Sequence, residues 1–263
     1  MARNIISFAG AGRVAGALCT EFYNAGIKIQ KIVSEFEAHG EPLAKKCNAS
    51  WSSELKFPDS TDIIIVAVPD HKLKELVGVI DCHEHTMVAH TAGSYGLEVF
   101  PDRLKRTGVL YPLQTFSKDR EVDFRNLPFF IETSDKDFSD ILSNLVESIG
   151  GNVHFVDTER RKMLHVAAVF VCNFINHMLT SGDKVASRAG FSLEILKPLI
   201  TETVSKAIDI GPARSQTGPA IRNDLNTIEK HLELLSFSPE LQATYREITR
   251  SIITHYKNES MNG

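Results

Sequence analysis

The chain has 263 residues, with 29 lysines and arginines, 33 aspartates and glutamates, and a formal net charge of -4 when the histidines are neutral. This length can bury one large core or two modest ones. The slightly acidic balance, without a basic stripe, argues against a nucleic-acid partner, so a small acidic ligand would have to be held by local groups.

The cysteines and the apolar stretches favour a cytoplasmic protein. The four cysteines form no CxxC pair, and no histidine stands at ligand spacing from them, so reduced thiols are favoured over disulfides or a metal site. The longest apolar stretches, residues 63–68 and 166–171, are too short to cross a bilayer, and no secretory signal is visible. We therefore expect no membrane partner. The cysteines are Cys19, Cys47, Cys82 and Cys172.

The first sixteen residues predict a strand, a glycine turn and a helix. The apolar residues 5–9 lead into Gly10, and apolar residues at helical spacing follow. A dinucleotide-binding βαβ unit needs this order, because the free N–H groups at the start of the helix meet a diphosphate. Gly10 would make the turn and Gly12 would let the backbone approach the pyrophosphate; the alternative is an ordinary strand-to-helix turn. The residues expected to contact a dinucleotide here are Gly10, Ala11, Gly12, Arg13 and Val14.

The rest of the first half alternates short apolar runs with helical stretches. This pattern is typical of a mostly parallel sheet covered by helices on both faces. Residues 61–68 are the clearest strand, because they are rich in β-branched side chains and stop at Pro69, after which Asp70 can cap a helix. Further strands are expected at residues 27–33, 86–90, 109–112, 129–131 and 153–156, and a helix at residues 40–47.

From about residue 157 onward, helical periodicity replaces the strand-like runs. A long apolar helix is expected at residues 163–180. A second helix would start at Ser192, with Pro198 kinking or delaying it, and Asp224 and Ser238 would begin the last two. The sequence therefore predicts an α/β domain at residues 1–157 and an all-helical domain at residues 158–263.

Four segments follow predicted strands, at the edge where open parallel sheets bind ligands. They are residues 10–16, 68–71, 90–94 and 111–116. Each has an ordinary structural explanation: a helix start, a packed histidine at a strand end, or a rigid connection between domains. Four such segments at one edge are harder to explain by chance than any one alone.

Two segments of the second half carry polar groups in unusual surroundings. His165 and Asn173 lie in the apolar helix, about 80° apart on a 3.6-residue helix, and could line a cleft. A lone helical histidine is more often a packed or surface group than an acid. Residues 217–224 crowd small, rigid and charged side chains before a helix. They form either a capped turn or a loop over a cleft, with Thr217 or Arg222 meeting substrate.

Read together, these segments resemble one bacterial family, the putative NADP oxidoreductases with a Rossmann-like domain and a helical domain of unknown function. The match runs in order over nearly the whole chain, and its most specific parts are the Pro-Leu-Gln-Thr-Phe segment at 112–116 and the Thr-Gly-Pro segment at 217–219. The architecture is similar to pyrroline-5-carboxylate reductases and to 6-phosphogluconate and β-hydroxyacid dehydrogenases, so the second domain is expected to resemble the helical domain of the 6-phosphogluconate enzyme.

The resemblance implies a nicotinamide cofactor, hydride transfer, and a dimer formed through the helical domain. Two departures limit it. Ala92 stands where the family usually has serine, which leaves Ser94 as a substitute candidate. The Lys-x-x-x-Asn pair of the β-hydroxyacid dehydrogenases is absent, and His165 with Asn173 occupies the comparable place.

The choice of cofactor depends on the end of the second strand. An acidic side chain there favours NAD, because it accepts the ribose 2′-OH, whereas Ser34 would tolerate the 2′-phosphate of NADP. Glu35 is close by, no arginine follows, and Arg13 and Lys31 are the nearest cations in the sequence. The resemblance favours NADP, and NAD stays open.

The leading hypothesis is a dimeric NAD(P)-dependent oxidoreductase that acts on a small carbonyl, imine or alcohol. His165 would give or take the proton and Asn173 would orient the substrate. The rivals are a non-catalytic dinucleotide-binding redox sensor and a partner-binding protein without cofactor. The nicotinamide side would be walled by Val68, Pro69, His90 and Gly93, and the substrate candidates are Ser94, Gln114, Thr217 and Arg222.

Overall fold

The computed structural model describes residues 4–117 and 120–262, with side chains up to residue 257. The chain divides into two compact units, Met1–Cys172 and Asn173–Gly263.

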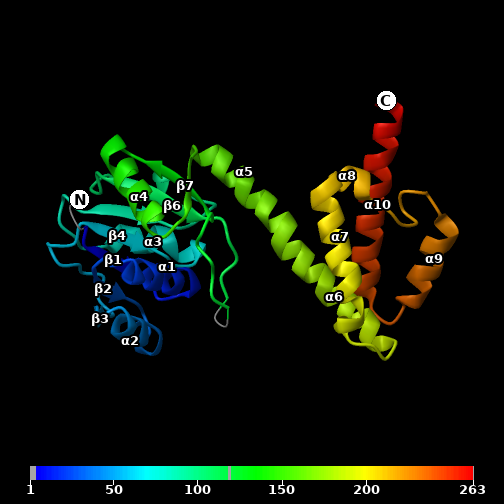
Figure 1. Ribbon diagram of the computed structural model, residues 1–263, viewed down its shortest axis with the longest axis horizontal. Coiled ribbons are helices and arrows are strands. Elements are labelled where there is room, and N and C mark those ends of the chain that lie inside the picture. Colours follow the sequence, from blue (N-terminus) through cyan, green and yellow to red (C-terminus); the bar gives the residue numbers. More distant parts are fainter. Residues whose placement is uncertain (1–3, 118–119, 263) are drawn as a thin grey trace. The chain divides into compact units, whose positions relative to one another are not determined.

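The first unit is built on an eight-stranded sheet in the order β3-β2-β1-β4-β5-β6-β7-β8 (Figure 1). Every neighbouring pair is parallel except β6 and β7, so the mostly parallel α/β domain expected from the sequence is confirmed. The strand order reverses direction between β1 and β4, the point where open sheets leave a crevice at the carboxyl ends of their strands. The strands are β1 (Ile6–Ala9), β2 (Ile29–Val33), β3 (Ser50–Ser52), β4 (Ile63–Val66), β5 (Met87–His90), β6 (Thr107–Pro112), β7 (Pro128–Thr133) and β8 (Asn152–Phe155).

Helices cover both faces of the sheet because the central strands are apolar on both sides. In β4, Ile63 and Ile65 pack into one core cluster with α1, α2 and α4, whereas Ile64 and Val66 pack into another with α3. This alternation follows from the two-residue period of a strand. The helices of this unit are α1 (Arg13–Asn24), α2 (Glu37–Lys46), α3 (Asp70–Val79), the 3-10 turn η1 (Leu97–Val99), α4 (Lys136–Ser148) and α5 (Thr158–Ala168).

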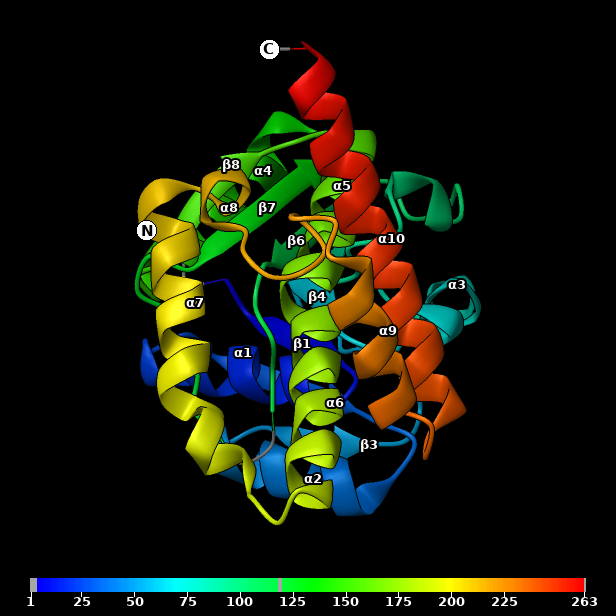
Figure 2. The same ribbon diagram turned by 90° about the vertical axis from the view of Figure 1, so that its right-hand side faces the viewer.

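The second unit is helical, as expected (Figures 1 and 2). Asp224 caps α9 by accepting a hydrogen bond from the amide of Thr227 at 3.1 Å, as predicted. The helix expected from Ser192 instead begins with a 3-10 turn, and Pro198 lies in the first turn of α7, where proline is tolerated without a kink. The segments that follow α5 are the π-helical η2 (Val169–Phe174), α6 (Ile175–Arg188), the 3-10 turn η3 (Leu193–Leu196), α7 (Lys197–Ile210), α8 (Pro212–Ser215), α9 (Leu225–Leu234) and α10 (Pro239–Asn262).

The helical segment that begins after β8 is longer than expected. It runs from Thr158 to Arg188 and, by length and composition alone, is apolar enough to cross a membrane, although a long helix of a soluble protein passes the same test. The expectation that every apolar stretch is too short to cross a bilayer considered only runs of consecutive apolar residues. It missed this helix, whose apolar residues are interrupted by polar ones. The last strand ends at Phe155 and α5 begins at Thr158, whereas the boundary between the two compact units falls later, between Cys172 and Asn173.

A buried ion pair fixes the start of α5 to the sheet. The Arg161 side chain has no exposed surface, and its guanidinium pairs with Glu132 of β7 and also donates to the carbonyl of Tyr95. The Thr158 hydroxyl donates to the same carboxylate at 2.9 Å. Because a buried charge without its partner is costly, these bonds determine where α5 leaves the sheet.

His90, at the end of β5, is a buried polar residue of the core. Its ring has no exposed surface, Nδ1 accepts from the amide of Ala92 at 3.2 Å, and Nε2 lies 3.3 Å from the carbonyl of Gly96. Since Nδ1 accepts, the proton is on Nε2 and is donated to Gly96. Burial lowers the pKa of His90 from 6.5 to about 4, so the ring is neutral at physiological pH.

We expect Arg161→Ala to lower the free energy of unfolding by about 3 to 5 kcal/mol, because it leaves Glu132 partly buried without its cation. Chemical denaturation measures this loss. Arg160→Ala, one position earlier on the exposed side of α5, is the matched control and should change stability by less than about 0.5 kcal/mol. Equal effects of the two variants would contradict the anchoring role of Arg161.

His90 should also make stability depend on pH. Its pKa is lower in the folded chain than in the unfolded chain, so the unfolded chain binds more protons between pH 6.5 and about 4. The stabilisation is therefore present above pH 6.5 and is lost as the pH falls through this window, by on the order of 3 kcal/mol. The free energy of unfolding of His90→Gln, measured by chemical denaturation at each pH, should change less across this window than that of the unmodified protein. The same dependence on pH in both proteins would refute this assignment.

Candidate functional site

The turn after β1 requires glycine. Gly10 has a φ of +114°, and a Cβ there would lie 2.3 Å from the carbonyl oxygen of Ala67, which follows β4. Its amide donates to the carbonyl of Val33 at 2.7 Å. At Gly12, the N-cap of α1, a Cβ would meet nothing within 4 Å, and no side chain caps the helix. The loop is therefore pressed against the sheet at Gly10 and open to a ligand at Gly12.

A cavity of about 660 Å³, which we call the switch-point cavity, lies at the carboxyl ends of β1, β2 and β4. Several residues predicted to bind the cofactor line it. Val14, which was also predicted to contact the dinucleotide, does not line it and instead packs against the core. The position agrees with the crevice expected where the strand order reverses. The predicted residues that line this cavity are Gly10, Ala11, Gly12, Ser34, Val68 and Pro69.

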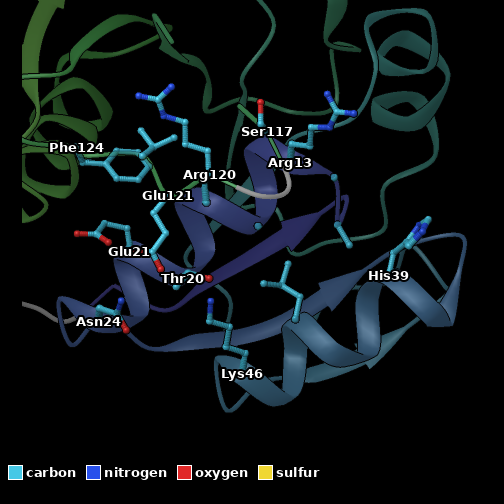
Figure 3. Close-up of a pocket in the computed structure, with 16 residues that line it drawn as sticks. Arg13, Thr20, Glu21, Asn24, His39, Lys46, Ser117, Arg120, Glu121 and Phe124 are labelled. Atoms are coloured by element: carbon cyan, nitrogen blue, oxygen red, sulfur yellow. The ribbon is translucent and has the colours of Figure 1, made fainter. Parts of the chain in front are cut away.

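A second cavity, of about 850 Å³, lies between α1, α2 and the loop that joins β6 to β7 (Figure 3). It shares Ala11, Gly12 and His39 with the switch-point cavity. Arg13, predicted to contact the dinucleotide, lines this cavity and not the other. Figure 3 shows charges of both signs around it, with Glu21 on α1 and Lys46 on α2. This mixture selects no single class of ligand.

Ser34 is held within the turn after β2. Its hydroxyl donates to the carbonyl of Phe36 at 3.0 Å and accepts from the indole N–H of Trp51 at 3.0 Å. Gly40 leaves room for this contact, since a Cβ there would lie 2.2 Å from the Ser34 oxygen. The only hydroxyl proton is thus in use, so Ser34 offers a ligand a lone pair and not a donor.

The loops after β4 and β5 are joined by their polar side chains. The Ser94 hydroxyl donates to the carboxylate of Asp70. Asp70 was expected to cap α3, but Pro69 is the N-cap and Asp70 is the first helical residue, with its carboxylate turned to Ser94. His90 shapes the second loop from within, because both ring nitrogens bond to the loop backbone.

His165 lies against the carboxyl end of the sheet. Its Nδ1 is 2.9 Å from the phenol oxygen of Tyr111, the residue before the last of β6. A Cβ on Gly93 would come within 2.6 Å of the same nitrogen, so only glycine leaves space for the ring. Burial raises the pKa of Tyr111, with a further contribution from Asp70, and the phenol therefore keeps its proton at neutral pH.

Tyr111 is a site residue that the sequence reasoning missed. Its place at the start of the segment 111–116, directly at a strand end, was the available signal. What singles it out is the contact with His165, 54 residues away in the chain. Gly93 and His165, both predicted, are brought together, although Gly93 provides space for the ring and exposes no side chain.

Of the other predicted substrate contacts, Gln114 lies in the loop after β6, and Asn173, Thr217 and Arg222 belong to the second unit. The exposed Gln114 accepts a hydrogen bond from the amide of Thr115 through its own side-chain oxygen at 2.8 Å. Asn173 is exposed at the start of the second unit, and the 80° separation from His165 does not hold, because Val169–Phe174 is π-helical and has wider turns.

Thr217 belongs to a cavity of the helical unit. That cavity, of about 670 Å³, is mostly apolar, lies among α6, α9 and α10, and contains a hydrogen bond of 2.8 Å between His231 and Tyr245. Arg222 is exposed on the turn before α9. Among residues 4–117 and 120–262, no group of three or more His, Cys, Asp or Glu side chains could hold a metal ion.

Comparison with known proteins matches both halves of the chain. Residues 1–115 match the family described as Rossmann-like domain, and residues 127–252 match the family described as Domain of unknown function (DUF2520). No curated protein matches the sequence.

Several solved structures are similar over nearly the whole chain. A protein from Bacteroides fragilis named putative NADP oxidoreductase is 37% identical, with a TM-score of 0.90 over 95% of this chain and 98% of that one. Protein TM1727 from Thermotoga maritima is 20% identical, with a TM-score of 0.69 over 97% and 99% of the two chains. A reductive aminase from Aspergillus terreus, in complex with NADPH and ethyl-5-oxohexanoate, is 12% identical, with a TM-score of 0.72 over 96% and 94%.

The last two likenesses, at 20% and 12% identity, concern the fold alone. The first is close enough in sequence to show the family, and it confirms the resemblance seen in the strand-end segments. The chain belongs to the family of the Bacteroides fragilis protein, in which a Rossmann-like domain is followed by a helical domain of unknown function.

Proposed function

We propose that the protein is an NADP-dependent oxidoreductase that transfers a hydride between the nicotinamide and a small carbonyl, imine or alcohol. One observation carries the proposal: the first unit has both an open glycine loop for a dinucleotide and a histidine–tyrosine pair at the carboxyl ends of its strands. The name of the Bacteroides fragilis relative supports the cofactor.

The glycine loop fits a dinucleotide. The space that a side chain would fill at Gly12 is open, and the first amides of α1 have no side-chain cap. Backbone N–H groups at such a helix start attract a diphosphate. Gly10, Ala11 and Gly12 would hold the pyrophosphate, and the switch-point cavity would hold the adenosine side.

His165 and Tyr111 would handle the proton. The bound nicotinamide would supply or accept the hydride, and the proton on the reacting oxygen or nitrogen would come from, or return to, Nε2 of His165. Nδ1 would keep its own proton throughout and donate it to the phenol oxygen of Tyr111, so that only Nε2 would gain or lose a proton. Because its pKa is raised, Tyr111 orients the imidazole and does not itself release a proton.

The helical unit would form a homodimer in the cytoplasm. Large apolar side chains are exposed along its helices, and Ile208 and Leu234 are 77% and 75% exposed in the single chain. Exposed apolar surface of this extent marks an interaction site. Asn173, Gln114, Ser94, Thr217 and Arg222 remain the proposed substrate contacts.

Replacing His165 tests the chemistry. With NADPH and a panel of small ketones, aldehydes and cyclic imines, His165→Gln should lower turnover by about a hundredfold or more, because the proton carrier is lost. The NADPH dissociation constant should stay unchanged. Unaltered turnover would remove His165 from this role, and NADPH binding without turnover of any substrate by the unmodified protein would favour the redox sensor.

Tyr111→Phe separates orientation from chemistry. Turnover should fall by about tenfold, and the pH dependence of the rate should shift, because the imidazole loses the hydrogen bond at Nδ1. A purely structural role of Tyr111 would leave the pH profile in place. An unshifted profile would therefore contradict the proposed role.

Light scattering tests the dimer. The unmodified protein should have twice the 29.2 kDa mass of one chain. Ile208→Glu should shift the mass toward one chain, because a charge cannot be buried in an apolar interface without its partner. The matched control is Glu202→Gln, at an exposed polar position of α7. A single-chain mass for the unmodified protein would disprove the proposed dimer.

A further inference from the structure

An ion pair stands on the wall of the switch-point cavity. The ammonium of Lys72, in the first turn of α3, lies 2.6 Å from a carboxylate oxygen of Glu35, which follows β2. Both residues line the cavity. Their side chains are 49% and 61% exposed, and such exposed pairs contribute little to stability. The pair can therefore exchange partners at small cost.

Lys72 carries the permanent positive charge of this cavity. Of the described residues that line it, no other lysine or arginine is present, and Glu35 and Glu75 are its carboxylates. The cations nearest in sequence are directed elsewhere: Lys31 donates to the carbonyl of Lys56 at 2.6 Å, and Arg13 lines the other cavity. Lys72 was not among the candidates from sequence, because it stands 37 residues after Glu35.

Ser34 does not compete with Lys72 for an anion. Its proton is donated to the carbonyl of Phe36, so a phosphate could take it only by breaking that bond. Its free lone pair suits a donor such as a hydroxyl. Ser34 therefore offers no proton to a phosphate at this wall, and Lys72 is the only lysine or arginine among the described lining residues.

We propose that Lys72 binds the 2′-phosphate of NADPH and that its pairing with Glu35 sets the preference between NADPH and NADH. The inference rests on the proposed function, since it concerns the adenosine side of the same dinucleotide site. The phosphate is attracted by Lys72 and repelled by Glu35, so Lys72 leaves the carboxylate when NADPH binds. The neutral 2′-hydroxyl of NADH instead donates to Glu35 and takes nothing from Lys72.

The chain contains a built-in reporter of this site. Trp51 is the only tryptophan in the sequence, and its indole N–H bonds to Ser34 at the cavity wall. Its fluorescence can be titrated in the full-length protein with NADPH, NADH, 2′,5′-ADP and 5′-ADP. 2′,5′-ADP carries the 2′-phosphate that 5′-ADP lacks, and neither carries a nicotinamide, so their comparison reports the contribution of this phosphate to binding. The titration needs no substrate.

Lys72→Met should weaken binding of NADPH and 2′,5′-ADP by about tenfold and change binding of NADH and 5′-ADP by less than about twofold. Lys72→Arg, which keeps the charge, should retain the preference for the 2′-phosphate. Glu35→Gln should tighten NADPH binding severalfold, because it removes the repulsion and frees Lys72, and should weaken NADH binding.

Two variants outside the cavity are matched controls. Lys74→Met removes a charge from an exposed position on the same helix, and Glu41→Gln breaks a different exposed pair, Lys45–Glu41, on α2. Neither should alter the ratio of the NADPH and NADH dissociation constants. An equal change in that ratio for Lys74→Met and Lys72→Met would overturn the proposal, since it would reflect overall charge.

The remaining outcomes separate this inference from the proposed function. Suppose that the protein binds both dinucleotides. If Lys72→Met then weakens the binding of NADPH and NADH equally, or changes the binding of neither, the role of Lys72 is overturned and the oxidoreductase proposal stands. If the unmodified protein binds neither NADPH nor NADH, both are overturned.

Discussion

The ion pair between Arg161 and Glu132 determines the geometry of the candidate site. A guanidinium without exposed surface must keep its partner, so the first turn of α5 stays on β7. One turn later, the same helix carries His165. The proton-handling group of the proposed mechanism is thus held by a buried contact that takes no part in the chemistry.

Small residues in the loop after β5 make this approach possible. A Cβ at Gly96 would lie 2.2 Å from the hydroxyl of Thr158, and a Cβ at Gly93 would meet His165. The buried ring of His90 bonds to the same loop from inside. The loop after β5 thus contacts α5 on one side and the buried His90 of β5 on the other, and it joins the start of α5 to the carboxyl edge of the sheet. This edge therefore carries the two groups on which the proposed function rests, the open glycine loop and the imidazole of His165.

The sequence predicted the features whose signals are local. The strand at Ile63–Val66, the glycine turn and the cap of Asp224 follow from periodicity and from individual residue types. The strand β3 was missed because it has only three residues, two of them serines. The change to π-helical geometry at Val169–Phe174 likewise has no periodic signal of its own.

The parts of the site that were not predicted depend on contacts between distant residues. Ser34 could be identified as the residue at the end of β2, but the hydrogen bond that its hydroxyl donates to the carbonyl of Phe36 and its contact with Trp51 exist only in the fold. The pairings of Tyr111 with His165 and of Lys72 with Glu35 join residues 54 and 37 positions apart. The strand-end segments thus indicated the edge of the sheet that carries the candidate site, and the fold determines which side chains face each other there.

The most direct test is a crystal structure of the protein with NADPH. We expect the pyrophosphate to lie on Gly10–Gly12 and the adenosine to lie in the switch-point cavity. The nicotinamide should extend toward Gly93, with one substrate-sized space between its reactive carbon and Nε2 of His165. A dinucleotide bound in the cavity between α1 and α2, or one whose nicotinamide points away from His165, would contradict this expectation.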